Sequence, residues 1–452
     1  MKRTALERDW TKGSIVGSLL SLSWPMIVTR TIMAVRPTID MIVVGRLGAA
    51  SVAGVGIGTI ATQMAEALKQ GLTIGVRALI ARLIGAEDKQ GAIHAAQQGY
   101  VISAIFAIFL AAVGVFLTEP ILLLLGVETD VAAQCAPYMR ITFVGGVFMV
   151  FRMMNDAIME ASGDSITPMK ITIVYTIFHA VLCPFLVFGW WFFPRLETSG
   201  AAWAGIASQC LGASIGLWVL LTGRSRLRLT FRNFRLDPKV IWRIVKIGLP
   251  GSITGMERGF AQFMVLWFLV PFGTLAVAAH SLSLRVDQFI HMPVAAWGIG
   301  AGVLGGQNLG ARQPERAQRT AWLGVGLSTI LMFIISIVIW FWAEGLALIF
   351  TPESDLIELT AIFFRIEIAT YLVFGIVMIL QQFLLGVGDT LPVMLITLVT
   401  MWGIQMPLAY FLPRVGNLGV YGVRWALVAG VVTRAIAYLP YFTLGTWKQK
   451  KV

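Results

Sequence analysis

Ionisable side chains interrupt the long apolar runs of this 452-residue chain at three places where they could exchange a cation. Asp40 lies late in the first run, Asp156 in the fourth and His179 in the fifth. A carboxylate can take up a proton or bind Na⁺, and an imidazole gains and loses protons near neutral pH. The three residues therefore form a candidate cation-coupling site. Two alternatives stay open: Asp40 could pair with Arg36 for structure, and His179 could serve packing alone.

Polar residues in the apolar runs of the C-terminal half could bind substrate or form a second coupling site. Glu257 could exchange a cation, but adjacent Arg258 makes an ion pair or a contact with an anionic substrate the alternative. Arg285 and Asp287 are candidates for the same site, with a structural role as their alternative. Glu367 follows an arginine by two positions in a later run.

Methionine and arginine side chains within the runs bear on the kind of substrate. Met153 and Met256 could line an adaptable pocket, although packing is the commoner role of such residues. Arg152 precedes Asp156 by four positions, so we expect the two to pair on one helical face. Unpaired arginines would favour an anionic or zwitterionic substrate. The basic residues within the runs are Arg30, Arg36, Arg152, Arg258, Arg285 and Arg434.

The elements that must position these residues are membrane-spanning helices. Of all residues 57% are hydrophobic and 13% are charged, and the mean hydropathy is +0.80. A soluble domain carries about 25% charged residues, so this chain could not cover a water-facing surface. The apolar runs are long enough to span a bilayer as helices and lack the alternation of barrel strands. We expect an all-α integral membrane fold with 12 transmembrane helices in two six-helix bundles, related by a pseudo-twofold along the membrane normal.

Proline residues are predicted to act as hinges within the spans, because proline removes a helical hydrogen bond. Pro25 and Pro37 interrupt the first run and Pro250 the seventh. Residues 1–222 are expected to form the N-terminal lobe, 223–240 a basic cytoplasmic linker that acts as a flexible tether, and 241–452 the C-terminal lobe. The predicted spans are 16–44, 51–78, 92–118, 131–159, 168–193, 199–222, 241–270, 275–304, 317–343, 356–386, 391–412 and 419–444.

The charges of the loops predict the orientation of the chain. Lysine and arginine gather in alternate loops, which is typical of the cytoplasmic side. This basic side includes both termini and the stretch from Arg224 to Lys246, whereas the opposite loops are mostly acidic. The net charge of +12 thus reflects topology rather than nucleic-acid binding. We expect a multi-pass protein of the cell (inner) membrane with cytoplasmic termini and no cleaved signal peptide.

The two halves of the chain carry the same landmarks at a nearly constant offset in residue number. The series is co-linear, which chance does not explain, and each half holds six predicted spans. Both halves therefore enter the membrane in the same sense, as in transporters that rock between two open states. The matched landmarks are Pro25 with Pro250, Gly85-Ala86 with Gly310-Ala311, Arg140 with Arg365, Gly163-Asp164-Ser165 with Gly388-Asp389-Thr390, and Gly200 with Gly422.

These landmarks resemble those of the multidrug and toxic compound extrusion (MATE) family, nearest its DinF-like branch, from about residue 15 to 445. The resemblance implies two six-helix bundles, a central cleft, and export of drugs or metabolites driven by entry of H⁺ or Na⁺. It also implies that the first-helix aspartate, here Asp40, carries the coupling cation. The matching segments are the run from Asp40 to Gly48, the paired Gly-Asp turns, Gly306-Gln307-Asn308-Leu309-Gly310-Ala311, and Leu284-Arg285-Val286-Asp287 before His291-Met292-Pro293.

The chain departs from the family pattern in the fifth span. Where the family has N-x-x-x-D-P, this sequence reads His179-Ala180-Val181-Leu182-Cys183-Pro184, so the second carboxylate is missing and a histidine stands one turn away. Asp156, beside Asn155, occupies the usual asparagine position of the fourth helix. Because no cage of hard oxygen ligands for Na⁺ is evident, we favour H⁺ as the coupling ion. Glu257 is one position out of register with a coupling glutamate of some relatives.

Functions of other classes fit the sequence less well. The arginines within the spans keep open a lipid-linked precursor flippase of the same superfamily, or an exporter of an anionic or zwitterionic metabolite. A membrane-embedded enzyme would need clustered histidines, but the four histidines are scattered without HExxH spacing, and a channel would need a repeated pore loop. The motif GxxxxGK[ST] is absent, and the three cysteines form no CxxC pair, so neither ATP, a zinc site nor a disulfide is expected. We expect a monomeric transporter of small molecules, not an enzyme, with no cofactor and no resident metal.

Overall fold

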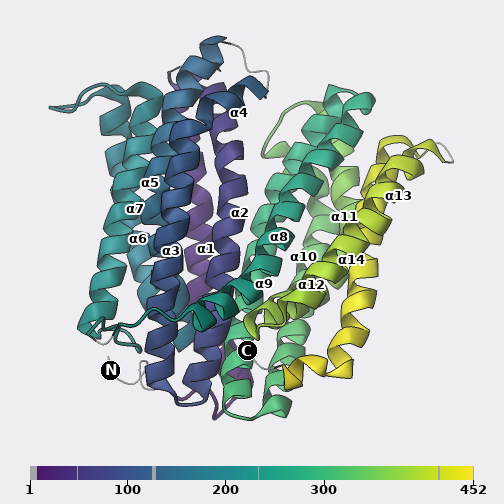
Figure 1. Ribbon diagram of the computed structural model, residues 1–452. Coiled ribbons are helices and arrows are strands. Elements are labelled where there is room, and N and C mark those ends of the chain that lie inside the picture. The colour runs from purple at the N-terminus through teal and green to yellow at the C-terminus, as the bar shows by residue number, and fades with distance from the viewer. Residues whose placement is uncertain (1–7, 48, 125–128, 233, 416–417, 451–452) are drawn as a thin grey trace. The chain divides into compact units, whose positions relative to one another are not determined.

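Helices make up the regular structure of this computed structural model in the part of the chain that it describes (Figure 1). The described backbone covers residues 8–47, 49–124, 129–232, 234–415 and 418–450, with side chains throughout except at 49–66, 121, 123–124 and 129–134. By length and apolar composition, nine of the described helical segments can cross a membrane.

Eleven of the twelve predicted spans coincide with a long helix and the one at 391–412 with a series of shorter helical pieces, so the predicted all-α membrane fold is confirmed within the described ranges. Most helices extend past the predicted ends; α2, for example, continues through Arg82 to Gly85. The first six are α1 Ile15–Gly45, α2 Ala49–Gly85, α3 Lys89–Phe116, α5 Thr129–Ser162, α6 Ile166–Phe188 and α7 Glu197–Thr222, with short α4 Thr118–Leu124 between spans. The second six are α8 Pro238–Leu269, α9 Thr274–Gly310, α10 Pro314–Leu348, α11 Ser354–Gly386, the pair α12 Thr390–Thr400 and α13 Met406–Phe411, and α14 Gly419–Leu444.

The sequence repeat is also present in the secondary structure. Helices α2 and α9 have the same length, as do α7 and α14, and each pair occupies matching positions of the repeat. Glu87 and Arg312, which also match, share a left-handed backbone with φ of 60° and 58°. Gly163 and Gly388 likewise share φ of 92° and 88° in the paired Gly-Asp turns. The two halves therefore repeat their turns as well as their helices.

Each half is organised around one central helix. In the first half α5 packs on α2, α3 and α7, and in the second half its counterpart α11 packs on α9, α10 and α14. A matched ion pair accompanies this helix in both halves. Arg140 of α5 bonds to Glu119 at 2.5 Å, and Arg365 of α11 bonds to Glu344 at 3.0 Å, with both members at matching positions of the repeat. The duplicated sequence therefore builds the same scaffold twice.

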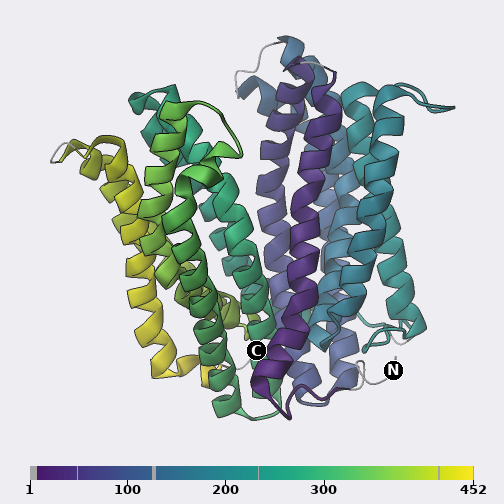
Figure 2. The same ribbon diagram turned by 180° about the vertical axis from the view of Figure 1, so that it is seen from behind.

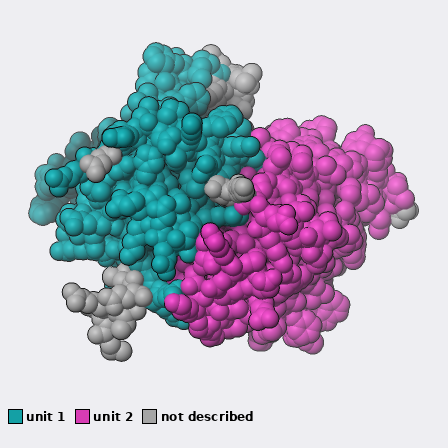
Figure 3. All heavy atoms as spheres, turned by 60° about the horizontal axis from the view of Figure 1, so that its bottom comes forward, with its two compact units in different colours: residues 1–9, 28–252 teal, residues 10–27, 253–452 magenta. Residues whose placement is uncertain are grey.

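Contacts divide the chain into two compact units, coloured in Figure 3. Unit 1 holds Met1–Asp9 and Val28–Ser252, and unit 2 holds Trp10–Ile27 and Ile253–Val452. The division crosses α1 and α8, each time shortly after the matched prolines Pro25 and Pro250. Helix α1, purple in Figure 2, is nevertheless continuous from Ile15 to Gly45. The units thus exchange half-helices, whereas the predicted lobes divide the chain at 222 and 240.

The basic linker is docked on unit 1, in contrast to the flexible tether expected from its composition. Leu227 and Leu229 are buried, and the buried hydroxyl of Ser225 donates to Asp164 at 2.9 Å. Burial lowers the pKa of Arg226 to about 10, so this side chain stays charged at neutral pH. The apolar and hydroxyl residues among the arginines are what fix the segment, and the charge pattern alone did not indicate this.

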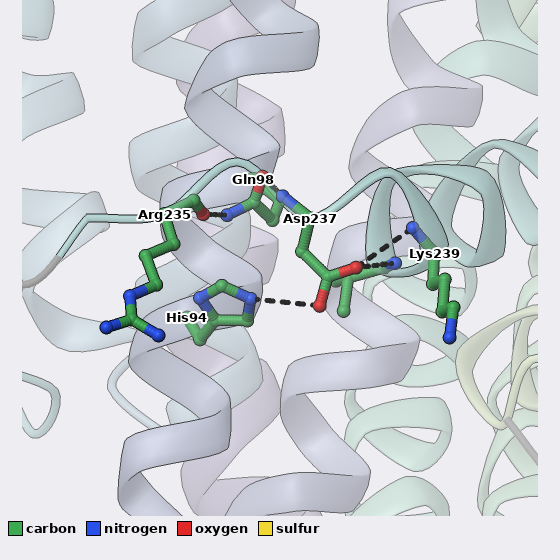
Figure 4. Close-up of polar contacts among 6 residues, drawn as sticks. His94, Gln98, Arg235, Asp237 and Lys239 are labelled. Carbon is green, nitrogen blue, oxygen red and sulfur yellow. Dashed lines mark hydrogen bonds and ion pairs between the residues drawn. The ribbon is translucent and has the colours of Figure 1, made fainter.

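The end of the linker is held by the first turns of α3, as Figure 4 shows. The side-chain amide of Gln98 donates to the carbonyl of Arg235 at 2.8 Å and accepts from the backbone N–H of Asp237 at 3.2 Å. Asp237 also lies 3.4 Å from His94 and accepts the backbone N–H groups of Lys239 and Val240. These bonds to the N–H groups lower the pKa of Asp237, and they cap the N-terminus of α8.

Candidate functional site

Asp40 and His179 form a carboxylate–imidazole pair between α1 and α6. The distance from His179 Nε2 to Asp40 Oδ1 is 2.8 Å. His179 is fully buried, whereas the Asp40 side chain is 15% exposed. An ionised carboxylate can only accept, so the imidazole N–H at Nε2 donates. We call these two residues the coupling pair; it joins a fully buried imidazole to a carboxylate that is partly exposed.

The surroundings of the coupling pair are mostly apolar, with Arg36 as a charged neighbour that interacts electrostatically with Cys183. Val43 and Val44 of α1 pack with Cys183 and Val187 of α6 and with alanines of α7. Cys183 Sγ lies 3.6 Å from Asp40 Oδ1, so the thiol is the second neighbour of the carboxylate. Among the described residues, the ion pair of Asp40 that the structure shows is the one with His179 and not one with Arg36. In this apolar setting an interaction between charged or polar groups is stronger than in water.

Asp156 belongs to a different group from the coupling pair. Its Oδ2 lies 2.5 Å from Arg152 Nη1, which confirms the pairing expected from their spacing of four. One turn further along α5, Glu160 pairs with Arg77 of α2 at 3.0 Å. Arg30 of α1 interacts electrostatically with Asp156. The three residues predicted to form one cation site therefore lie in two places.

We call this second group the arginine centre; it consists of Arg30, Arg77, Arg152, Asp156 and Glu160. Three guanidinium groups face two carboxylates, so cations outnumber anions. Neutral donors and acceptors surround them: Gln209 accepts from Arg152 Nε at 2.6 Å, and Tyr100 donates to Asn155. A positively charged polar centre in a membrane protein suits an anionic group better than a cationic one.

Unit 2 contains a buried group that we call the carboxylate cluster: Asp287, Glu367, Tyr371 and Arg424. The Tyr371 hydroxyl donates to Asp287, and Arg424 Nη1 lies 3.5 Å from Glu367. Glu367 and Asp287 are each 6% exposed, and Arg424 is 1% exposed. The proximity of Glu367 to Arg365 in sequence was misleading, because Arg365 points to Glu344 at the helix surface. Arg424 is thus the cation that interacts with both acids, Glu367 and Asp287, which lie close together.

Glu257 of α8 is a further buried acid of unit 2. Both of its carboxylate oxygens are buried without a hydrogen bond in the described structure. Arg434 and Arg258 interact with it electrostatically. Arg434 Nε donates to Thr400, where α12 passes into a π-helical turn at Met401–Gln405. Buried acids without partners and π-helical turns both occur preferentially at functional sites.

The remaining residues predicted from the sequence do not come together in one site. Arg258 and Arg285 are exposed, and Arg258 Nη2 lies 3.5 Å from Gln381. Met153 and Met256 are half-buried. Pro25 and Pro250 are buried near the points where the two units exchange half-helices, while Pro37 is exposed.

Some residues of these groups were not singled out from the sequence. Arg424 lies inside the last apolar run, where any ionisable residue is a candidate, so its position was a sufficient signal. Glu160 lies just past the predicted end of the fourth span, because α5 is longer than its apolar run. Cysteine spacing indicates no role for Cys183, and only the packing of α1 on α6 brings it to Asp40.

Comparisons with known proteins agree with this fold and layout. A model of the family described as MatE matches the chain twice, at residues 25–185 and 259–411. The chain is 25% identical over 447 residues to the probable multidrug resistance protein YoeA of Bacillus subtilis, covering 98% of this chain and 96% of the relative. It is also 25% identical to a FAD transporter of Shewanella oneidensis, covering 92% and 91%.

Solved structures show the same fold. An outward-facing multidrug resistance MATE family transporter of the MOP superfamily gives a TM-score of 0.90 at 21% identity, with 99% of each chain covered. A MOP superfamily transporter from Pyrococcus furiosus, whose binding pocket is described as having reverse polarity, gives 0.91 at 20% identity, also with 99% of each covered. Two successive matches to one family model cover more than half of the chain and coincide with its two halves. The chain therefore belongs to the MatE family of multidrug and toxic compound efflux transporters.

Proposed function

We propose that this transporter exports a small molecule in exchange for protons, and that the coupling pair Asp40–His179 carries the exchanged proton. The observation that carries the proposal is the 2.8 Å contact between a buried imidazole and a carboxylate with 15% of its side chain exposed. A coupling group has to meet water from each side of the membrane in turn. We expect Asp40 to do so, because Asp287 and Glu367 are more deeply buried.

The chemistry of the neighbours favours a proton over Na⁺. Sodium is held by several oxygen ligands, as other hard cations are. The groups within 4.8 Å of one another here are one carboxylate, one imidazole and one thiol. When a proton arrives, the neutral imidazole becomes a cation that the Asp40 carboxylate stabilises, and its departure restores the original hydrogen bond. The pair therefore has two states that differ by one charge.

Movement of the helices would link this charge to transport. The proposed hinges are Pro25, Pro37 and Pro250. The first and last of these lie just before the points where the units exchange half-helices. A proline deprives the carbonyl one turn earlier of its helical partner, so α1 can bend there at low cost. We place the chain in the cell membrane with both termini cytoplasmic, as its loop charges predict, and treat Glu257 as a substrate or second coupling group.

A second candidate concerns the substrate, which could be anionic. The arginine centre supports this candidate, since three guanidinium groups face two carboxylates there. A relative named as a FAD transporter and a structural neighbour with a pocket of reverse polarity are consistent with it. A lipid-linked precursor flippase remains within the same candidate, because its substrate carries pyrophosphate.

Transport into inside-out vesicles tests the proposal. Vesicles with an imposed pH gradient are compared with vesicles under an imposed Na⁺ gradient, using a cationic dye and a flavin nucleotide as separate probes. We expect accumulation driven by the pH gradient and not by the Na⁺ gradient. Accumulation that follows the Na⁺ gradient alone would reject proton coupling. Preference for the flavin nucleotide over the dye would select the anionic substrate.

A further inference from the structure

The structure assigns a second chemical property to the coupling pair: together with Cys183, it forms a binding site for a thiophilic divalent cation such as Zn²⁺ or Cd²⁺. Cysteine spacing along the chain gives no sign of a metal site here. The proposal rests on the contact between two helices that brings three donor atoms of different kinds together.

The donor atoms have the identities and separations that such an ion needs. Asp40, His179 and Cys183 each offer one ligand atom, and these atoms all lie within 4.8 Å of one another. Carboxylate oxygen, imidazole nitrogen and thiolate sulfur are the ligands of tetrahedral zinc. With bond lengths of about 2.0 to 2.3 Å, two donors of a tetrahedral ion lie roughly 3.3–3.6 Å apart. The observed oxygen–sulfur separation is 3.6 Å, and the oxygen–nitrogen separation of 2.8 Å needs to open only by about 0.5 Å.

The two helices hold these donors in place. His179 and Cys183 are four positions apart on α6, so they project from the same face of that helix. Both are fully buried, and the valines and alanines of α1, α6 and α7 pack around Cys183. Asp40 enters from α1 and is the exposed member of the three, with 15% of its side chain uncovered. We expect an ion to arrive along the Asp40 side and a water molecule to complete the four ligands.

The charge of the site also suits such an ion. Binding a divalent cation displaces the thiol proton of Cys183 to the solvent, and the imidazole binds through Nε2. Two anionic ligands then neutralise the two positive charges of the ion, so the ion and its three protein ligands together carry no net charge; Arg36, which interacts electrostatically with Cys183, is a nearby cation. A hard cation such as Mg²⁺, which requires oxygen ligands and retains its water, does not match this donor set.

The consequence for transport rests on the proposed function of the coupling pair. A metal ion on Asp40 and His179 occupies the groups that carry the proton, and it fastens α1 to α6. Micromolar Zn²⁺ or Cd²⁺ should therefore inhibit export, and a chelator should restore it. Inhibition by Zn²⁺ and Cd²⁺ would show that thiophilic divalent cations block the proton site.

Direct binding can be measured without any transport. Cadmium bound to a thiolate absorbs in the ultraviolet, so titration of the detergent-purified protein with Cd²⁺ reports a ligated cysteine. The chain offers its own controls, since Cys135 lies in a separate apolar group on α5 and Cys210 is on α7. We expect the band to saturate at one ion per chain in the wild type, Cys135→Ser and Cys210→Ser, and to vanish in Cys183→Ser. Thermal unfolding and gel filtration in the same detergent establish that each variant is folded.

Variants of the other two ligands, Asp40 and His179, provide a second test of the metal site. Asp40→Asn and His179→Gln keep the cysteine but should weaken Cd²⁺ binding by at least about 100-fold, the upper end of what loss of a supporting residue costs a metal site. Zn²⁺ should displace Cd²⁺ from the wild type. A band that persists in Cys183→Ser, or Cd²⁺ binding unchanged in both ligand variants, would overturn the metal site.

Transport measurements separate the two proposals. Loss of Cd²⁺ binding in Cys183→Ser, together with export that Cd²⁺ no longer inhibits, supports both. Normal Cd²⁺ binding by the wild type without inhibition of export rejects the blocked proton site while the metal site stands. No Cd²⁺ binding, combined with loss of proton-driven export in Asp40→Asn, rejects the metal site and leaves the coupling pair in place.

Discussion

The two halves of this transporter share a scaffold but not their polar chemistry. The surface pairs Glu119–Arg140 and Glu344–Arg365 occur at matched positions, as do the Gly-Asp turns. The coupling pair, the arginine centre and the carboxylate cluster have no such matches. By the same offset, Asp40 corresponds to Val265, and Asp156 corresponds to Gln381. Duplication therefore preserved what shapes the bundle, and the functional groups diverged within it.

The difference extends to how each group is enclosed. The coupling pair of the first half has a carboxylate with 15% of its side chain exposed and a partner that can gain a charge. The carboxylate cluster of the second half is closed, and its cation, Arg424, is permanently charged. A partly exposed pair with a titratable partner is suited to exchange a proton. A closed pair with a permanently charged cation is suited to stabilise the fold. Substitutions in each half test whether the two groups differ in this way.

The largest effect is expected from Arg424→Met in the carboxylate cluster. Removing the cation leaves Glu367 and Asp287 buried together without a compensating charge. Breaking a buried ion pair costs about 3–5 kcal/mol of folding free energy. Arg365→Met at the exposed pair is the matched control and should cost about 0–1 kcal/mol. Thermal unfolding in detergent compares the two, and equal stability of both variants would show that the cluster is not structural.

Replacement of His179 by glutamine should lower proton-driven export and flatten its dependence on pH. The glutamine amide can still donate to Asp40, but it cannot gain a proton. Export rates measured across the neutral range should therefore vary less with pH than in the wild type. His94→Gln removes another histidine that contacts an aspartate and should leave the profile as it is. If His179→Gln keeps the wild-type profile, the histidine serves packing only.

Glu257→Gln should alter substrate recognition while leaving coupling intact. The buried carboxylate lies near Arg434 and Arg258, so its neutralisation changes the charge that a substrate meets in the second half. We expect a changed KM for a cationic dye, with accumulation still driven by the pH gradient. Loss of gradient-driven accumulation in this variant would transfer the coupling role to the second half and end the proposed contrast.

The smallest effect is expected where the linker meets α3. The pKa of Asp237 is lowered by backbone N–H donors, so its contribution to stability is present above its unfolded pKa and is lost as pH falls through the folded one. Asp237→Ala should speed hydrogen exchange of residues 234–242 at neutral pH, and acidification should do the same to the wild type. Unchanged exchange in Asp237→Ala would mean that Gln98 alone holds the segment.

The sequence was sufficient for the scaffold because apolar run length and loop charge are local signals. All twelve spans, the repeat and the Arg152–Asp156 pair on one helix face followed from spacing along the chain. Contacts between helices did not follow in the same way. Asp156 was grouped with Asp40, and Glu367 with Arg365, because packing rather than spacing decides which buried groups meet. The docked linker was missed for a similar reason, since its few buried leucines are hidden among arginines.

Proton release on substrate binding tests the central claim most directly. The purified wild type in weakly buffered detergent solution is mixed with a transported dye, and the released protons are measured with a pH indicator. We expect release from the wild type and from the exposed-site control Asp355→Asn, and none from Asp40→Asn although it remains folded. Undiminished release from Asp40→Asn would contradict the assignment of the exchanged proton to the coupling pair.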